Sequence, residues 1–358
     1  MALTFQQQLL RWFEKHQRDL PWRRDRDAYH IWVSEVMLQQ TTVATVTPRF
    51  LRFLTRFPTI IDLAQADEQA VLLEWEGLGY YRRARNMHRA ARMLAKLGSD
   101  LPDDPAVWSE LPGVGRYILG AVLSQAFDRR LPIVEANSQR VLCRLFARRG
   151  DPAQGDVKKW LWQKAEEILP RRRVGDFNQA LMELGATVCI PTAPRCDICP
   201  VARHCQAFQQ GIQGEIPEKS ARPAVEKVDE VAVVIRRGVK ALLVQRPSVG
   251  RWSNMWEFPH VTLEKGQTHH AAALQLLNAF GLKADLGGEI MTIRHAVTRF
   301  RITMVCIEAR YRSGTIGKIA YPDAKWLSPA EWHDYPVSTP QRKLANELAK
   351  DSRQLRLF

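Results

Sequence analysis

Apolar residues recur at every third or fourth position through the first 210 residues of the chain. This spacing lets a helix bury one face, so it predicts α-helices rather than strands. Glycine and proline cluster between the periodic segments and predict turns there, as at Gly77–Gly79 and Leu111–Gly113. The expected helices are Phe5–Lys15, Ile31–Thr47, Pro48–Phe57, Glu68–Trp75, Arg82–Leu97, Tyr117–Phe127, Gln139–Phe146, Lys158–Leu169 and Phe177–Cys189.

The pattern changes after residues 211–226, where scattered glycine, proline and charged residues are typical of a linker. Two short apolar runs then flank a turn and predict a strand–turn–strand unit. The elements expected in this second region are the strands Val231–Ile235, Ala241–Val244 and Ile302–Tyr311 and the helix Thr268–Phe280. We therefore predict a mostly α N-terminal region (1–210), a linker (211–226), an α+β domain (227–350) and a tail (351–358).

Composition and charge narrow the class of protein. The chain has 358 residues, of which 46% are hydrophobic and 25% charged, as expected of packed domains. Its net charge of +14 favours a polyanionic partner such as DNA. No apolar run approaches the roughly 18 residues that a membrane span needs, and the N-terminus has no apolar signal core. We expect a cytoplasmic, nucleoid-associated monomer.

Four of the six cysteines fall within 17 residues, with six, two and five residues between them. In a chain without a secretion signal, this crowding favours a metal centre over disulfides. Zinc and a [4Fe–4S] cluster both accept four thiolates, so the spacing alone leaves both open. The four candidate ligands are Cys189, Cys196, Cys199 and Cys205.

A glycine-containing turn, Leu111–Arg116, lies between two expected helices. Gly113 and Gly115 permit a tight hairpin with positive φ and remove side chains where a backbone approaches a ligand. The free N–H groups of the helix that follows form an anion site, so the hairpin fits a DNA phosphate. The alternative is an ordinary turn between two helices.

Two carboxylates stand in largely apolar surroundings. Glu35 lies in the expected helix Ile31–Thr47, where it is either a core-edge residue with a partner or a catalytic acid. Glu135 precedes a helix that begins near Ser138, where it is either a helix cap or a catalytic group. Such a pair suits glycosidic bond cleavage, which needs an acid for the leaving group and a negative charge for the sugar cation.

These features together resemble the adenine DNA glycosylases (the MutY type), members of the endonuclease III superfamily of helix–hairpin–helix glycosylases. The resemblance implies a helix–hairpin–helix fold, a [4Fe–4S] cluster on the four cysteines, and base excision repair. The implied substrate is adenine mispaired with 8-oxoguanine or guanine, which is flipped out of the duplex before the bond is hydrolysed. The segments that carry this resemblance are Leu20–Arg23, Ser34–Thr41, Gly77–Tyr81, Leu111–Arg116 and the cysteine loop.

The resemblance also implies roles for individual residues. Glu35 is implied to be the acid that protonates the adenine ring, with Glu135 and Asn137 as its catalytic partners. Tyr117 stands where the related lyases carry a lysine nucleophile, and tyrosine forms no Schiff base, so we expect a monofunctional glycosylase. This also argues against a pyrimidine-lesion glycosylase/lyase. The implied base pocket is Trp22, Arg23 and Gln179, and the implied DNA contacts are Gln40, Tyr81, Gly113, Gly115 and Thr298.

The chain departs from the family pattern at two sites. Glu135–Asn137 reads Glu-Ala-Asn where the family usually has Asp-Gly-Asn, and the extra methylene displaces the charge by about 1 Å, a shift that costs on the order of 100-fold in rate. The alternative function is therefore a mismatch-binding protein with weak or altered catalysis. The loop expected to read 8-oxoguanine is Val297–Arg299 in place of Phe-Ser-His, so Thr298 keeps only a hydroxyl.

The second domain resembles a Nudix domain, through Gly250–Trp252 and Trp256–Pro259. Its helix lacks the carboxylates that would hold magnesium, so we expect no Nudix hydrolysis. The tail resembles the short peptide with which repair proteins bind the DNA sliding clamp; the alternative is a frayed amphipathic end. The residues of this implied clamp peptide are Gln354, Leu355, Leu357 and Phe358.

Overall fold

The computed structural model describes residues 3–218, 224–317 and 321–354. Its contacts divide the chain into two compact units. Unit 1 consists of residues 1–65 and 85–221, and unit 2 of residues 66–84 and 222–358. Residues 66–84 were predicted to belong to the helical region, whereas they group with the C-terminal part of the chain.

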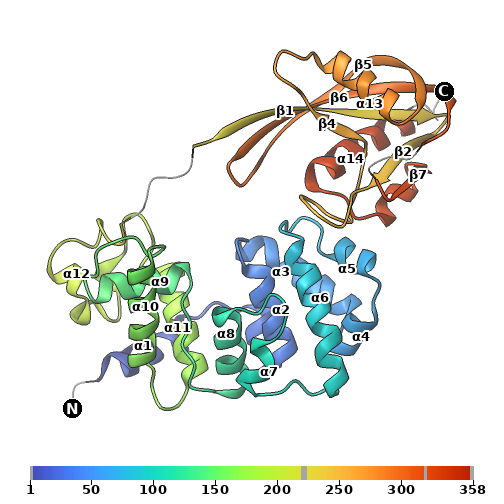
Figure 1. Ribbon diagram of the computed structural model, residues 1–358. Coiled ribbons are helices and arrows are strands. Elements are labelled where there is room, and N and C mark those ends of the chain that lie inside the picture. The colour runs from blue at the N-terminus through green and yellow to red at the C-terminus, as the bar shows by residue number, and fades with distance from the viewer. Residues whose placement is uncertain (1–2, 219–223, 318–320, 355–358) are drawn as a thin grey trace. The chain divides into compact units, whose positions relative to one another are not determined.

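Unit 1 is helical (Figure 1). α8 packs against α2 and α11, and α11 also packs against α1 and α9. Buried apolar side chains of α1, α9 and α11 form one core cluster. The elements are α1 (Phe5–His16), η1 (Pro21–Arg23), α2 (Ala28–Leu38), α3 (Val43–Arg56), α4 (Ile60–Gln65), α6 (Arg82–Leu94, which starts in unit 2), η2 (Ala95–Leu97), α7 (Pro105–Ser109), α8 (Arg116–Phe127), α9 (Ala136–Leu145), α10 (Gly155–Glu167), α11 (Val174–Thr187), η3 (Cys196–Ile198), η4 (Ala202–His204) and α12 (Gln206–Gln209).

Two predicted helices have the wrong bounds. The segment Ile31–Thr47 is not continuous, because α2 ends at Leu38 and α3 begins at Val43. Gln40 adopts a left-handed backbone with φ of 57°, and the Thr42 side chain caps α3 by accepting from the Thr45 amide. α3 then continues through Pro48, where a break was predicted, although a proline removes one hydrogen-bond donor from the helix.

Unit 2 is built on a mixed sheet with strand order β3-β2-β1-β6-β5; β4 also pairs with β1 and β7 with β2. β1 and β6 run parallel and the other pairs are antiparallel. The elements are α5 (Glu68–Glu74), β1 (Glu226–Arg237), β2 (Lys240–Gln245), β3 (Trp256–Glu257), β4 (His260–Thr262), α13 (His269–Ala279), β5 (Leu282–Val297), β6 (Phe300–Gly314), β7 (Asp323–Leu327), η5 (Glu331–Asp334) and α14 (Thr339–Gln354).

Successive side chains of β1 point to opposite faces of the sheet and contribute to two core clusters. Val231 and Val233 face a cluster that includes α13, while Ala232 and Val234 face a cluster that includes α14. The two helices therefore cover opposite faces of the sheet (Figure 1). α14 continues to Gln354 and so enters the predicted tail.

Residues 66–84 are bonded to the rest of unit 2 through polar side chains. The Arg342 guanidinium donates to both carboxylate oxygens of Glu76, at 2.7 and 2.9 Å. Asn254 donates to Glu68 at 2.7 Å, and the Tyr81 hydroxyl donates to the carbonyl of Val337 at 3.4 Å. These long-range contacts explain why this segment groups with the C-terminal part of the chain.

No helix in the described part of the chain combines the length and the apolar character that crossing a bilayer requires.

Candidate active site

The packing of α2 against α8 brings Glu35 to two hydrogen-bond donors. α2 begins at an Asp27 cap and is buried along most of its length, so Glu35 is only 4% exposed. The Tyr117 hydroxyl donates to Glu35 Oε2, and Gln125 Nε2 donates to Oε1 at 2.9 Å. The structural alternative for Glu35, a core carboxyl with hydrogen-bond partners, is therefore observed.

Burial raises the pKa of Glu35, because a buried carboxylate loses its hydration. The hydrogen bonds from Tyr117 and Gln125 and the charge of Arg23 oppose this effect without cancelling it. The result is a carboxyl that keeps its proton to higher pH than an ordinary glutamate, as a general acid requires.

Glu135 is the N-cap of α9, which begins at Ala136 rather than near Ser138. Its two carboxylate oxygens accept from the backbone amides of Asn137 and Ser138, each at 2.8 Å. The structural alternative for Glu135 is therefore observed, and it fixes the direction of the carboxylate.

Burial also raises the pKa of Glu135, although the amides of Asn137 and Ser138 oppose the shift. The charge of Glu35 raises it further, so the two carboxyl groups interact electrostatically. A charge on Glu35 therefore disfavours ionisation of Glu135.

Asn137 is linked through Arg140 to the start of the cysteine loop. The Arg140 Nη2 atom donates to Asn137 Oδ1 at 2.8 Å and to the Gly185 carbonyl at 2.7 Å, and its Nε atom donates to the Cys189 carbonyl at 2.7 Å. Gly185 lets the two helices meet here, because a Cβ at this position would lie 2.6 Å from the Asn137 Cβ. The capped end of α9 and the cysteine loop thus share one buried arginine.

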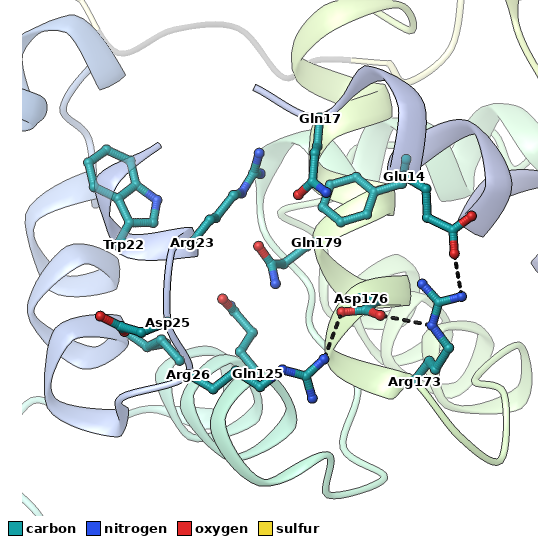
Figure 2. Close-up of a pocket in the computed structure, with 12 residues that line it drawn as sticks. Glu14, Gln17, Trp22, Arg23, Asp25, Arg26, Gln125, Arg173, Asp176 and Gln179 are labelled. Atoms are coloured by element: carbon teal, nitrogen blue, oxygen red, sulfur yellow. Dashed lines mark hydrogen bonds and ion pairs between the residues drawn. The ribbon is translucent and has the colours of Figure 1, made fainter. Parts of the chain in front are cut away.

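A cavity of about 170 Å³ lies beside Glu35. All three residues predicted to form the base pocket line it, while Glu35 is reached through Gln125, whose side chain forms part of the wall. Figure 2 shows Trp22 and Arg23 on one side and the Gln125 and Gln179 amides extending into the space. The lining residues are Phe13, Glu14, Gln17, Trp22, Arg23, Asp25, Arg26, Ile31, Gln125, Arg173, Asp176 and Gln179.

The position of Arg23 is fixed by a fully buried carboxylate, Glu183 on α11. Arg23 donates to Glu183 Oε2 at 2.9 Å, and Arg18 donates to both of its oxygens at 2.7 and 2.9 Å. Burial alone would raise the pKa of Glu183, but the hydrogen bond from Arg18 and the charge of Arg23 outweigh it and lower the pKa. Arg23 is thereby held in the wall of the pocket.

The hairpin before α8 has the predicted open backbone. Gly113 has a φ of 83°, and a Cβ there would lie 2.7 Å from the Asn86 Cβ, so a larger residue is excluded. Gly115 caps α8 with an ordinary φ of −95°, so the expectation of a positive φ is wrong there. A Cβ at Gly115 would meet open space, which leaves the N-terminus of α8 accessible.

The other predicted DNA contacts lie elsewhere. Tyr81 is 4% exposed and bonded to Val337, whereas the neighbouring Tyr80 is 49% exposed with a φ of 46°. Gln40 occupies the left-handed turn between α2 and α3. Thr298 lies at the exposed tip of the β5–β6 hairpin with a φ of 52°, which is unusual for a β-branched residue.

The four loop cysteines line one small cavity together with Arg144. Arg144 is 2% exposed; its Nη1 atom lies 3.3 Å from Cys189 Sγ, and it donates to the carbonyls of Ile190 and Pro191. Among the described residues, no group of three or more His, Cys, Asp or Glu side chains is arranged to hold a metal ion. The thiols gather around a common space without converging on one point.

Comparison with known proteins identifies the family. Residues 33–167 match the model of the HhH-GPD superfamily base excision DNA repair proteins, and residues 230–347 match the NUDIX domain model. The chain is 37% identical to the adenine DNA glycosylase of Rattus norvegicus, over 95% of this chain and 77% of that protein. It is 35% identical to that of Homo sapiens, over 95% of this chain and 73% of that protein. The chain belongs to the adenine DNA glycosylases.

A solved DNA glycosylase shares the fold of more than half of the chain. A thermostable thymine-DNA glycosylase superposes with a TM-score of 0.52 at 28% identity, over 57% of this chain and 95% of that one. The predicted fold class is thus confirmed, as is the prediction of a base excision repair enzyme that hydrolyses N-glycosidic bonds. The alternative of a mismatch-binding protein is not favoured.

Sequence reasoning missed the residues that hold the predicted ones in place. Gln125, Glu183, Arg140 and Arg144 are all buried and polar. A polar residue in an apolar helix is a usable signal for Gln125, and a pair of arginines four residues apart is one for α9. Nothing local marks Glu183, whose partners lie 160 and 165 residues away.

Replacement of Glu183 by glutamine should destabilise unit 1. Two arginines lose their anion, and we expect a loss of about 2–4 kcal/mol in the free energy of unfolding at pH 7. Because the pKa of Glu183 is lowered on folding, its contribution is present at neutral pH and is lost as the pH falls through that pKa. The difference between wild type and Glu183→Gln in urea unfolding should therefore shrink in acid.

The matched control is Glu215→Gln, which removes the partner of Arg149 from an exposed ion pair and should change the unfolding free energy far less. A Glu183→Gln protein as stable as the control would contradict the assignment.

Proposed function

We propose that this glycosylase removes adenine mispaired with 8-oxoguanine or guanine, by flipping the base out of the duplex and hydrolysing its N-glycosidic bond. The observation that carries the proposal is the buried carboxyl of Glu35, bonded to Tyr117 and to a residue in the wall of the pocket. The name of the relatives points to adenine as the base that is removed, and the cavity offers a site for that base.

Glu35 acts as the general acid in this proposal. Each of its oxygens already accepts one hydrogen bond, so a proton on the carboxyl must occupy another lone pair. Transfer of that proton to a ring nitrogen turns the base into a neutral leaving group, and the raised pKa keeps the proton on the carboxyl to higher pH than on an ordinary glutamate. Trp22, Arg23 and Gln179 hold the base meanwhile.

Glu135 supplies the negative charge for the sugar cation. Its two backbone hydrogen bonds fix the carboxylate at the start of α9, and Asn137 is oriented from behind by Arg140. These contacts support a catalytically competent position for the Glu135 carboxylate, although its side chain is one methylene longer than aspartate. Tyr117 forms no Schiff base, so the enzyme releases the base without cutting the strand.

The DNA contacts follow from the exposed backbone and loops. The turn with Gly113 and Gly115 binds a phosphate at the N-terminus of α8. Gln40 and Tyr81 enter the base stack, for which Tyr81 has to leave its contact with Val337. Thr298 contacts the base opposite the adenine from its hairpin tip.

We propose a [4Fe–4S] cluster on Cys189, Cys196, Cys199 and Cys205. The donor set fits, because four thiols line one cavity and Arg144 donates toward Cys189 Sγ. The four thiolates would hold the cluster, and the cluster would tie the ends of the loop together.

Protein purified without oxygen should contain about four iron atoms per chain and absorb in the visible range. Cys199→Ser should lose iron, since one cluster ligand is missing, whereas Cys306→Ser, which alters a buried thiol of the other unit, should retain it. One zinc per chain and no iron would contradict the cluster.

The implied clamp peptide falls at the end of the chain: residues 355–358 lie outside the described residues. We propose that it binds the DNA sliding clamp through Leu357 and Phe358. Deletion of residues 354–358 should abolish binding to the clamp in surface plasmon resonance and leave base release from short duplexes unchanged. Equal clamp binding by the full and shortened chains would end this proposal.

Single-turnover base release from duplexes with adenine opposite 8-oxoguanine or guanine tests the function itself. Wild type should release adenine without strand cleavage, and Glu35→Gln should fall by at least about 100-fold because the acid is lost. Glu135→Asp measures the effect of the extra methylene against wild type. Binding without release by wild type, with release restored in Glu135→Asp, would favour the mismatch-binding protein instead.

A further inference from the structure

Gln125 connects the catalytic carboxyl to the base pocket. It lies near the end of α8, is 5% exposed, and donates from Nε2 to Glu35 Oε1 at 2.9 Å. The same side chain lines the cavity that contains Trp22 and Gln179. A buried amide is costly unless it is hydrogen-bonded, so the bond to Glu35 determines how this side chain lies.

That bond determines which end of the amide faces the pocket. Glu35 Oε1 accepts the hydrogen bond from Gln125 Nε2, so the amide nitrogen is turned toward Glu35 and the amide oxygen is turned away. Figure 2 shows the Gln125 oxygen extending into the space beside Gln179. Within the described part of the chain, no residue donates a hydrogen bond to that oxygen. The amide oxygen of Gln125 is therefore an unused hydrogen-bond acceptor.

The charged side chains that line the cavity already form ion pairs. Arg23 is bonded to Glu183, and Asp176 forms ion pairs with both Arg26 and Arg173. Arg173 also pairs with Glu14 (Figure 2). The Gln125 oxygen is therefore well placed to meet a polar edge of a base directly.

We propose that Gln125 is a specificity-determining residue, which accepts a hydrogen bond from the exocyclic amino group of the flipped base while it holds Glu35. This inference rests on the proposed function. Adenine presents its amino group (N6) and an acceptor nitrogen (N7) on one edge. Because Gln125 and Glu35 are bonded to each other, they are placed to meet that edge together, N6 at the amide oxygen and N7 at the acid.

The arrangement selects against purines with an oxygen at position 6. Hypoxanthine would set its carbonyl against the Gln125 oxygen, two acceptors facing each other, and unsubstituted purine offers no donor at this position. A site that is built around a hydrogen bond discriminates through the partner that is left unpaired.

The test compares base release and binding for three bases opposite the same partner: adenine, hypoxanthine and unsubstituted purine. Wild type is measured beside Gln125→Leu, which keeps the approximate volume and removes the amide. In this variant we expect the ratio of the release rate of adenine to that of each other base to fall about tenfold, because one hydrogen bond is lost. Gln154→Leu, the same change at an exposed position on the cap of α10, should keep the wild-type ratios.

Dissociation constants are measured in parallel on duplexes whose target sugar carries a 2′-fluorine, which resists formation of the sugar cation. If Gln125→Leu slows release of all three bases equally and leaves the ratios of Kd unchanged, Gln125 only supports the fold and the proposal is overturned. If wild type releases no base but its Kd ratios favour adenine and lose that preference in Gln125→Leu, the proposed function fails and the role of Gln125 stands.

Discussion

The site depends on a single carboxyl group that is buried between two helices. Glu35 is placed there because α2 is apolar on nearly all sides and packs against α8, and two donors of α8 then fix its two oxygens. Burial raises the pKa of Glu35 and the donors limit that rise. The helix packing thus orients this carboxyl and shifts its titration to higher pH than that of an ordinary glutamate.

The remaining parts of unit 1 support that arrangement from two directions. Glu183 fixes Arg23 at the pocket and places a positive charge near Glu35. On the other side, Arg140 joins Asn137 to the cysteine loop through the Cys189 carbonyl. The loop is therefore joined to the N-terminal end of α9, although it supplies no group to the pocket.

The sequence was sufficient for residues that carry a recognisable motif. The predicted pocket residues Trp22, Arg23 and Gln179 line one cavity, and the four cysteines line another. It was insufficient where structure depends on distant partners. The grouping of residues 66–84 with the C-terminal part rests on contacts such as Arg342 with Glu76, which are 266 residues apart. β5 was missed because three register shifts disturb its alternation, and the break after α2 was missed because Thr42 caps a new helix.

The measurement that tests this account most directly is the protonation of Glu35 itself. Infrared difference spectra between wild type and Glu35→Gln, recorded against pH, isolate the carbonyl stretch of the protonated carboxyl. The raised pKa of Glu35 predicts that this band persists above the ordinary glutamate pKa of 4.5. A band that disappears at or below that value would show an ionised Glu35 at neutral pH, and the general-acid role would fail.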